Sequence, residues 1–128
     1  MSKFTSTFNR FAELPEKVVR GSLISLSARI IERSPVDSGR FRGNWQITVN
    51  SPATKQLSNK DKKGKKRKAA IAQKINSYKE SQNVFYLTNN LPYGERLEFG
   101  WSKQAPNGMV RRTLSEFDQL LQQEVKKT

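Results

Sequence analysis

The sequence predicts an α+β domain in which a small antiparallel sheet is flanked by an N-terminal and a C-terminal helix, with a long basic insertion loop between the first and second strands. Three observations predict this fold. Apolar residues recur at helical spacing near both ends of the 128-residue chain, two segments between them carry strand patterns, and a Lys-rich stretch separates those segments. A chain of this length forms one domain, and helices packed on a short antiparallel sheet make an α+β architecture.

The N-terminal helix is predicted over residues 15–33, where apolar residues recur at i, i+4, i+7 and i+11: Val19, Leu23, Leu26 and Ile30. It should end before Pro35, because the residue that precedes a proline is pushed out of the α region. Residues 1–14, which carry phenylalanines at helical spacing, are expected to form an N-terminal arm or a short helix. Residues 15–128 are then the single α+β domain.

Two strands are predicted from the pattern of their side chains, and a short third strand is also expected. Residues 34–39 are a turn by composition, and residues 41–50 then alternate apolar and polar side chains, as a strand with one buried face does. Residues 84–88 are the second strand, and residues 95–99 are a short third strand or a bent continuation. Residues 100–108 form a loop before the last element.

The last element is predicted as a helix, because one apolar face is again spaced at i, i+4, i+7 and i+11: Val110, Leu114, Phe117 and Leu121. Among the strand residues, Trp45 and Phe99 are expected to pack in the core. Asp37 is expected to cap its turn, and Glu98 to pair with an arginine such as Arg40 or Arg42.

The basic character of the chain belongs to one segment. The net charge is +13, and residues 55–74 hold nine cations against one anion, Asp61. Because no apolar residue occurs between Leu57 and Ala69, the insertion over residues 51–80 is expected to be a mobile loop or arm that becomes weakly helical from Lys65 onward.

Two interpretations of this Lys-rich segment stay open. It is either a solvated, solubilising loop, or it contacts a polyanion or an acidic protein surface, since closely spaced cations release counterions when they meet phosphates. The second interpretation assigns the contact to seven residues: Lys60, Lys62, Lys63, Lys65, Lys66, Arg67 and Lys68. No aromatic residue lies among these cations, so any nucleic-acid binding should be blind to sequence.

Composition makes catalysis a poor expectation. The chain contains no Cys and no His, which removes thiolate catalysis, iron–sulfur clusters, the usual structural zinc sites and the commonest general base. Its glycines lie too far apart for a phosphate-binding loop. We therefore expect no cofactor and no metal. No apolar run approaches the roughly 20 residues of a membrane helix, and no signal-peptide pattern is present, so a soluble protein made in the cytoplasm is expected.

Two motifs read together carry a family resemblance. Residues 34–45, SPVDSGRFRGNW, and residues 89–102, NNLPYGERLEFGWS, resemble the paired signatures of the tail-completion, or head-tail joining, proteins of tailed bacteriophages. Those proteins show a turn and strand of the form [ST]-P-V-D-[ST]-G-x-[LF]-[RK]-x-x-W, then N-x-x-P-Y-[AG]-x-x-L-E-x-G and a C-terminal helix. The resemblance covers about residues 15–125, and the Lys-rich insertion departs from it by being longer and more basic.

The resemblance implies a non-enzymatic structural protein of the virion neck. Such a protein assembles as a homo-oligomeric ring, by resemblance a hexamer, between the head connector or adaptor protein and the tail tube or tail terminator protein. The Lys-rich segment would then meet DNA in the lumen or the acidic surface of a partner ring. Because aromatic residues on loops are typical interface anchors, Tyr93, Trp101 and Lys103 are expected at a contact with the next subunit or a neighbouring ring.

Two other functions remain open at this stage. The chain could be a small basic nucleic-acid-binding protein whose Lys-rich arm grips phosphates while the α+β body anchors it. It could also be a morphogenesis chaperone that is absent from the finished particle.

Overall fold

The computed structural model describes residues 4–8, 16–77, 85–100, 102–105 and 107–127. The α+β class predicted from the sequence is confirmed, with helices at both ends of the domain. The elements, in chain order, are β1 (Phe4–Phe8), α1 (Glu16–Arg33), the short 3-10 helix η1 (Arg42–Asn44), β2 (Trp45–Val49), α2 (Lys65–Ser77), β3 (Phe85–Asn89), α3 (Gly94–Glu98), α4 (Val110–Leu114) and α5 (Phe117–Lys126).

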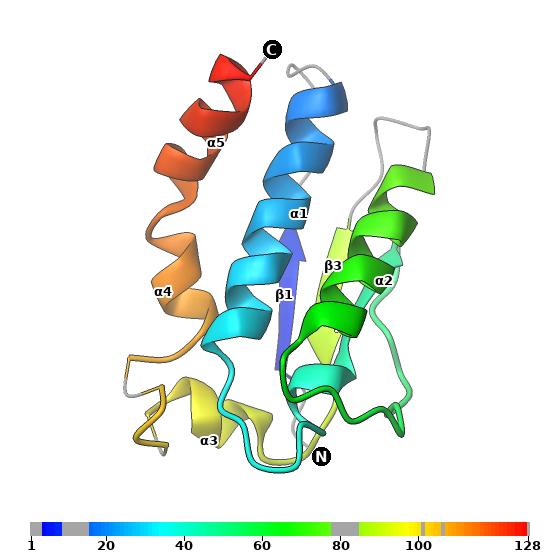
Figure 1. Cartoon of the computed structure of the whole chain (residues 1–128), viewed down its shortest axis with the longest axis vertical. Coiled ribbons are helices and arrows are strands. Elements are labelled where there is room, and N and C mark those ends of the chain that lie inside the picture. Colours follow the sequence, from blue (N-terminus) through cyan, green and yellow to red (C-terminus); the bar gives the residue numbers. More distant parts are fainter. Residues whose placement is uncertain (1–3, 9–15, 78–84, 101, 106, 128) are drawn as a thin grey trace.

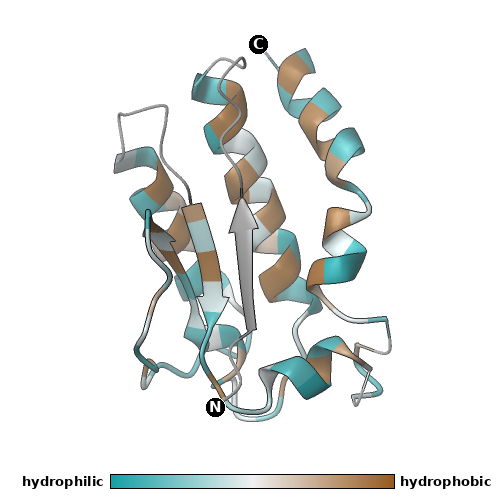
Figure 2. Cartoon of the chain, turned by 180° about the vertical axis from the view of Figure 1, so that it is seen from behind, coloured by the Kyte–Doolittle hydropathy of each residue, from teal (hydrophilic) through white to brown (hydrophobic). Residues whose placement is uncertain are grey.

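The sheet is antiparallel and its strands lie in the order β1-β3-β2. β3 is the central strand: its Asn89 pairs with Phe4 of β1 on one side and with Trp45 of β2 on the other. The long helices lie on one side of this sheet, with α1 between α2 and the α4–α5 pair (Figure 1). The view from behind shows the strands in front of these helices (Figure 2).

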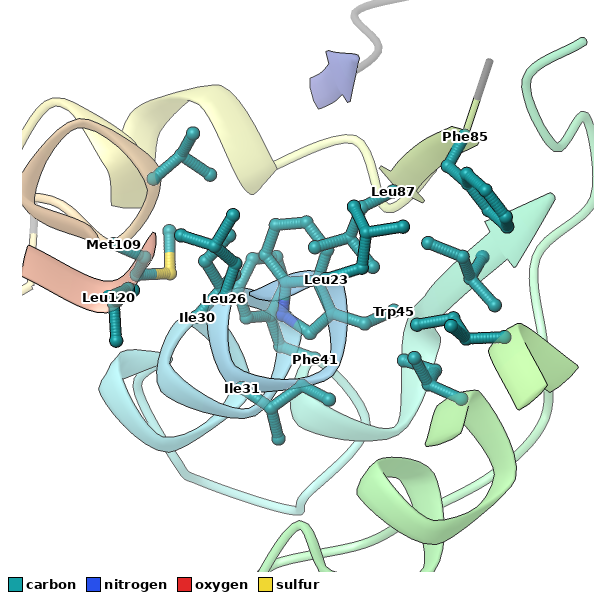
Figure 3. Close-up of a cluster of buried hydrophobic side chains, with 14 of the residues drawn as sticks. Leu23, Leu26, Ile30, Ile31, Phe41, Trp45, Phe85, Leu87, Met109 and Leu120 are labelled. Carbon is teal, nitrogen blue, oxygen red and sulfur yellow. The ribbon is translucent and has the colours of Figure 1, made fainter. Parts of the chain in front are cut away.

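The core lies between the sheet and α1. Leu23, Leu26 and Ile30 of α1 pack against sheet residues such as Trp45 and Leu87, as Figure 3 shows. Trp45 is fully buried, as the alternation predicted. Its indole Nε1 donates to Ser34 Oγ at 2.8 Å, and Ser34 Oγ donates in turn to the Ile30 carbonyl at 2.7 Å. The polar atom of the largest core side chain is therefore paired, as burial requires.

Helix α1 and strand β3 lie within one residue of their predicted positions, whereas three shorter elements differ. Residues 4–8 form an edge strand instead of an arm or short helix. A spacing of four residues fits one face of a strand as well as one face of a helix, so the phenylalanines could not separate the two. Residues 94–98 form helix α3 instead of a third strand, because a Glu-Arg-Leu-Glu run has good helix formers and no β-branched residue.

The strand predicted over residues 41–50 begins later, at Trp45, because η1 occupies the first positions. Gly43 lies so close to the following loop that a Cβ there would be 2.7 Å from the Asn59 carbonyl oxygen. Asn44 is buried, and its side chain donates to the Arg40 carbonyl and accepts from the Leu57 amide. Side-chain bonds of this kind offer the backbone an alternative to a sheet ladder.

In the Lys-rich segment, residues 51–64 form a loop and a helix begins at Lys65, the residue from which helical structure was predicted. Ile71 and Ile75, which follow the stretch without apolar residues, are buried against the core and hold α2 beside α1. Asp61 caps the N-terminus of α2, because its carboxylate accepts hydrogen bonds from the Gly64 and Arg67 amides at 3.1 and 2.8 Å. Such capping replaces partners that the first turn lacks.

Candidate assembly surface

The two motifs of the sequence meet in space. The turn that contains residues 35–41 and the segment that contains α3 enclose a shared pocket of about 250 Å³. We call its lining the motif surface: residues 35–41 together with Tyr93, Leu97, Ser102 and Gln104. It lies at the end of the domain where α3 and the adjoining loops gather (Figure 1).

A single side chain ties the two parts of the motif surface together. Gln104 Oε1 accepts from the Val36 amide at 2.8 Å, and Gln104 Nε2 donates to the Val36 carbonyl at 3.0 Å. The amide side chain thereby pairs with both backbone polar groups of Val36, as a neighbouring strand would. Sequence reasoning missed Gln104, since nothing local marks it as a partner for a residue so far away.

Strand β3 is tied to the first motif by the paired asparagines at its end. Asn89 Nδ2 donates to the Phe41 carbonyl at 2.9 Å, and Asn90 Nδ2 donates to the Ala53 carbonyl at 2.8 Å. Both asparagine residues are buried. Because buried amides must be paired, these bonds fix the position of the second motif relative to the turn and the following loop.

Tyr93, predicted as an interface residue, lies between core and solvent. Its ring stands 5.9 Å from the ring of buried Phe41, which in turn meets Trp45 edge to face at 5.7 Å. Tyr93 itself is 39% exposed. An aromatic side chain held on its inner side and open on its outer side is suited to anchoring an interface.

The other two predicted interface residues have different outcomes. Lys103 is exposed on the loop that follows α3, and it does not line the pocket. Trp101 lies outside the described residues. Tyr93 therefore belongs to the motif surface. Lys103 does not, although its neighbours Ser102 and Gln104 do.

The sequence suggested that Glu98 pairs with an arginine such as Arg40 or Arg42. Glu98 does pair with an arginine, but its partner is Arg111. Its buried carboxylate accepts from the amides of Met109, Val110 and Arg111 at 2.7 to 2.9 Å, and from Arg111 Nε at 3.0 Å. Negative charge at a helix N-terminus is favourable, so Glu98 caps α4. Its bonds also hold the two ends of the loop between α3 and α4 together. Gly108 in that loop has φ +82°, and a Cβ there would be 2.5 Å from the Glu98 carbonyl oxygen.

Arg42 has a structural role of its own. Its guanidinium donates to three carbonyls, those of Glu32, Ser34 and Lys62, at 2.8 to 2.9 Å. It thereby joins the end of α1 to the loop before α2. Arg40 instead donates to Gln56 Oε1 at 3.1 Å.

Phe99 is not a core residue: it is 65% exposed directly after α3. The Arg111 guanidinium lies 4.8 Å from the centre of its ring, at cation–π distance. The prediction failed because it placed Phe99 on a strand face. Tyr93 and Phe99 therefore flank α3 at its two ends as exposed aromatic residues.

A second apolar area lies on the C-terminal helices. The predicted helix is interrupted at Ser115 and Glu116, so the face of α5 is rotated relative to that of α4. Val110 and Leu120 are buried, but Leu114 and Val125 are 45% and 47% exposed. Leu121, Val125 and their neighbours border an apolar hollow of about 310 Å³. We call Leu121 and Val125 the C-terminal stripe.

The seven predicted polyanion contacts do not share one environment. Lys68 Nζ pairs with Glu32 Oε1 at 2.8 Å, and Arg67 is half-buried beside Asp61. Burial lowers the pKa of the Arg67 guanidinium, and the charge of Asp61 partly offsets that effect. The other five are exposed on the loop before α2 and on its first turn: Lys60, Lys62, Lys63, Lys65 and Lys66.

Among the described residues, no group of three or more Asp and Glu side chains is placed to hold a metal ion. None of the described helices is long and apolar enough to span a membrane. No family model, no curated protein and no solved structure matches the chain.

Proposed function

We propose that the chain is a structural subunit of a bacteriophage neck, forming a homo-oligomeric ring that joins the head connector to the tail tube. The observation that carries this proposal is the meeting of the two motifs. The segments that resemble tail-completion proteins fold onto each other through the contacts of Asn89 and Tyr93 with Phe41, and they leave an aromatic side chain exposed. If family members share these motifs because the motifs contact other subunits, the two motifs should lie on one surface of the subunit.

The exposed apolar residues support a ring. The described residues include four large exposed hydrophobic side chains, and these lie on two parts of the chain: Tyr93 and Phe99 around α3, and Leu114 and Val125 on the C-terminal helices. A closed ring of identical subunits uses two different complementary patches on each subunit. The groups supply such a pair, with the α3 aromatics of one subunit against the C-terminal stripe of the next. By resemblance the ring is a hexamer.

The proposed role is non-enzymatic, and its location is the virion. Its partners are the chain itself, a head connector or adaptor protein, and a tail tube or tail terminator protein. No cofactor is required, because the contacts are made by apolar and aromatic side chains on positions held by hydrogen bonds.

Native mass spectrometry of the purified chain tests the ring. The wild-type chain should form one closed oligomer, and Phe99→Ser or Val125→Ser should shift it to a monomer that stays folded by circular dichroism. Gln73→Ser, an exposed change on α2, is the matched control and should leave the oligomer unchanged. A wild-type chain that stays monomeric at tens of micromolar would contradict the ring.

A second function, non-specific nucleic-acid binding, is favoured by one observation. Five lysines are exposed around the start of α2, within a short stretch of chain. They could contact DNA phosphates either in the lumen of a ring or in an independent binding protein. A monomer that binds DNA would favour the independent protein.

A further inference from the structure

A groove lies between α2 on one side and η1, β2 and the loop of residues 57–61 on the other. Two pockets, of about 270 and 200 Å³, share Arg67 and Ala70 in their walls and so lie next to each other. From Lys66 to Lys74 the helix rises about 12 Å, at about 1.5 Å per residue. This length matches about four residues of extended chain, at roughly 3.3 Å each.

The first pocket is basic. Lys60, Lys66 and Arg67 line it, together with Asp61, whose carboxylate is already occupied by the amides of Gly64 and Arg67. The Arg67 side chain is only half-buried. A carboxylate in this pocket would therefore meet the guanidinium of Arg67 beside two ammonium groups, and hydrogen bonds between charged groups are stronger than neutral ones.

The second pocket has apolar side chains in its walls. Ile47 is buried on β2, and Leu57 and Ala70 are partly buried on either side of it. Lys74 stands at its far end. An acidic side chain in the first pocket and an apolar side chain in the second would be two residues apart on one extended chain, since alternate side chains share a face.

We infer that this groove binds an extended acidic segment of a partner protein, with a carboxylate on Arg67 and an apolar side chain between Ile47 and Leu57. Charge complementarity favours an acidic occupant, because Lys60, Lys66, Arg67 and Lys74 line the groove. The position of Lys66 and Arg67 in the wall of a pocket favours a peptide over duplex DNA. Phosphates on the convex surface of a duplex meet protruding cations, whereas a flexible side chain can enter a pocket. The inference needs only the monomer and stands apart from the ring.

The test uses NMR titration of the full chain with short blocked peptides. The probe Ac-SESLS-NH2 should shift the Arg67 Nε–H resonance, whereas Ac-SQSLS-NH2 should not bind. Ac-SESSS-NH2, which lacks the apolar side chain, should bind several-fold more weakly. A six-nucleotide oligo(dT) serves as the phosphodiester probe.

Two variants with the same loss of charge locate the contact. Arg67→Gln keeps the backbone amide that Asp61 caps, and it should weaken peptide binding at least about tenfold. Lys63→Gln, in the same segment but outside both pockets, should weaken it less than about twofold. If Arg67→Gln unfolds, Arg67→Lys, which keeps the charge but lacks the planar guanidinium that binds a carboxylate through two N–H groups, should still lose most of the affinity.

Three results would overturn the inference. Equal losses in Arg67→Gln and Lys63→Gln would show diffuse attraction without a site. A shift of Arg67 Nε–H by oligo(dT) but not by the peptide would assign the groove to phosphodiesters. Absence of binding by the Ac-SESLS-NH2 peptide would show that the groove has no such ligand.

Discussion

Gln104 closes the first motif by pairing with both backbone polar groups of Val36, at 2.8 and 3.0 Å. This relationship joins a loop after α3 to a turn before η1. It adds to the contacts of Asn89 and Tyr93 with Phe41, which join the two sequence motifs.

Gln104→Ala should loosen the motif surface without unfolding the domain. Two exposed hydrogen bonds are lost, so the free energy of unfolding should fall by about 1 to 2 kcal/mol. Hydrogen exchange of the Val36 amide should become faster, while that of the Leu87 amide in the core should change only with global stability. An unaltered Val36 exchange rate would show that the bond does not hold the turn.

Trp45→Ala should lower the free energy of unfolding by about 3 to 5 kcal/mol, because a large side chain is removed from a close-packed core. Trp45→Phe should cost less, since it keeps part of the ring and loses the bond to Ser34. Urea unfolding monitored by circular dichroism measures both. A Trp45→Ala variant as stable as the wild-type chain is incompatible with the described core.

Glu98→Gln should destabilise the loop before α4. The neutral amide has one acceptor oxygen where the carboxylate has two, and it loses the charge that meets Arg111 and the start of α4. We expect a loss of about 2 to 3 kcal/mol, typical of a hydrogen-bonded charged group. Glu95→Gln, exposed on the same short helix, is the control and should change stability by less than about 0.5 kcal/mol.

Glu116 gives the chain a stability that depends on pH. The hydrogen bond from Arg33 lowers the pKa of the Glu116 carboxyl, Arg29 and the charges of both arginines add to this effect, and burial opposes it. Because the folded pKa is depressed, this contribution is present above the unfolded pKa of about 4.3 and is lost as pH falls through the folded pKa.

Melting temperatures from pH 7 down to pH 2.5 measure this contribution. Glu116→Gln should lower the melting temperature at pH 7 and flatten its fall in the acid range. Asp118→Asn, an exposed carboxylate on α5, should leave the acid limb as in the wild-type chain. Parallel curves for Glu116→Gln and the wild-type chain would argue against the pair with Arg33.

The five exposed lysines before and on α2 predict the salt dependence of any DNA binding. If they contact about five phosphates, the logarithm of the affinity should fall with the logarithm of the salt concentration with a slope of about −4.5, and the affinity should not depend on DNA sequence. Fluorescence anisotropy with two unrelated duplexes measures this slope. A slope near zero would exclude phosphate contact by these lysines.

Local patterns were sufficient for the long elements and the centre of the core. The repeat of apolar residues placed α1, the alternation placed Trp45 inside, and the Lys-rich stretch gave the start of α2. Each of these features depends on a periodicity or a composition that one segment carries by itself.

The short elements could not be predicted because distant partners determine them. Residues 4–8 are a strand since β3 supplies their ladder, and Phe99 is exposed since α3 is a helix held by the bond of Glu98 to α4. Helix α2 lies beside α1 because Ile71 and Ile75, which follow the stretch without apolar residues, reach the core. The sequence did not predict that the two motifs meet, and no local pattern marks the contact of Gln104 with Val36.

A structural subunit of a bacteriophage neck, as proposed for this chain, must be present in finished particles. Gold-labelled antibody against the chain, applied to purified particles of the proposed phage and viewed by electron microscopy, is the decisive measurement. We expect label at the junction of head and tail in finished particles. Finished particles that carry no label and contain none of the chain by mass spectrometry would contradict the proposed role.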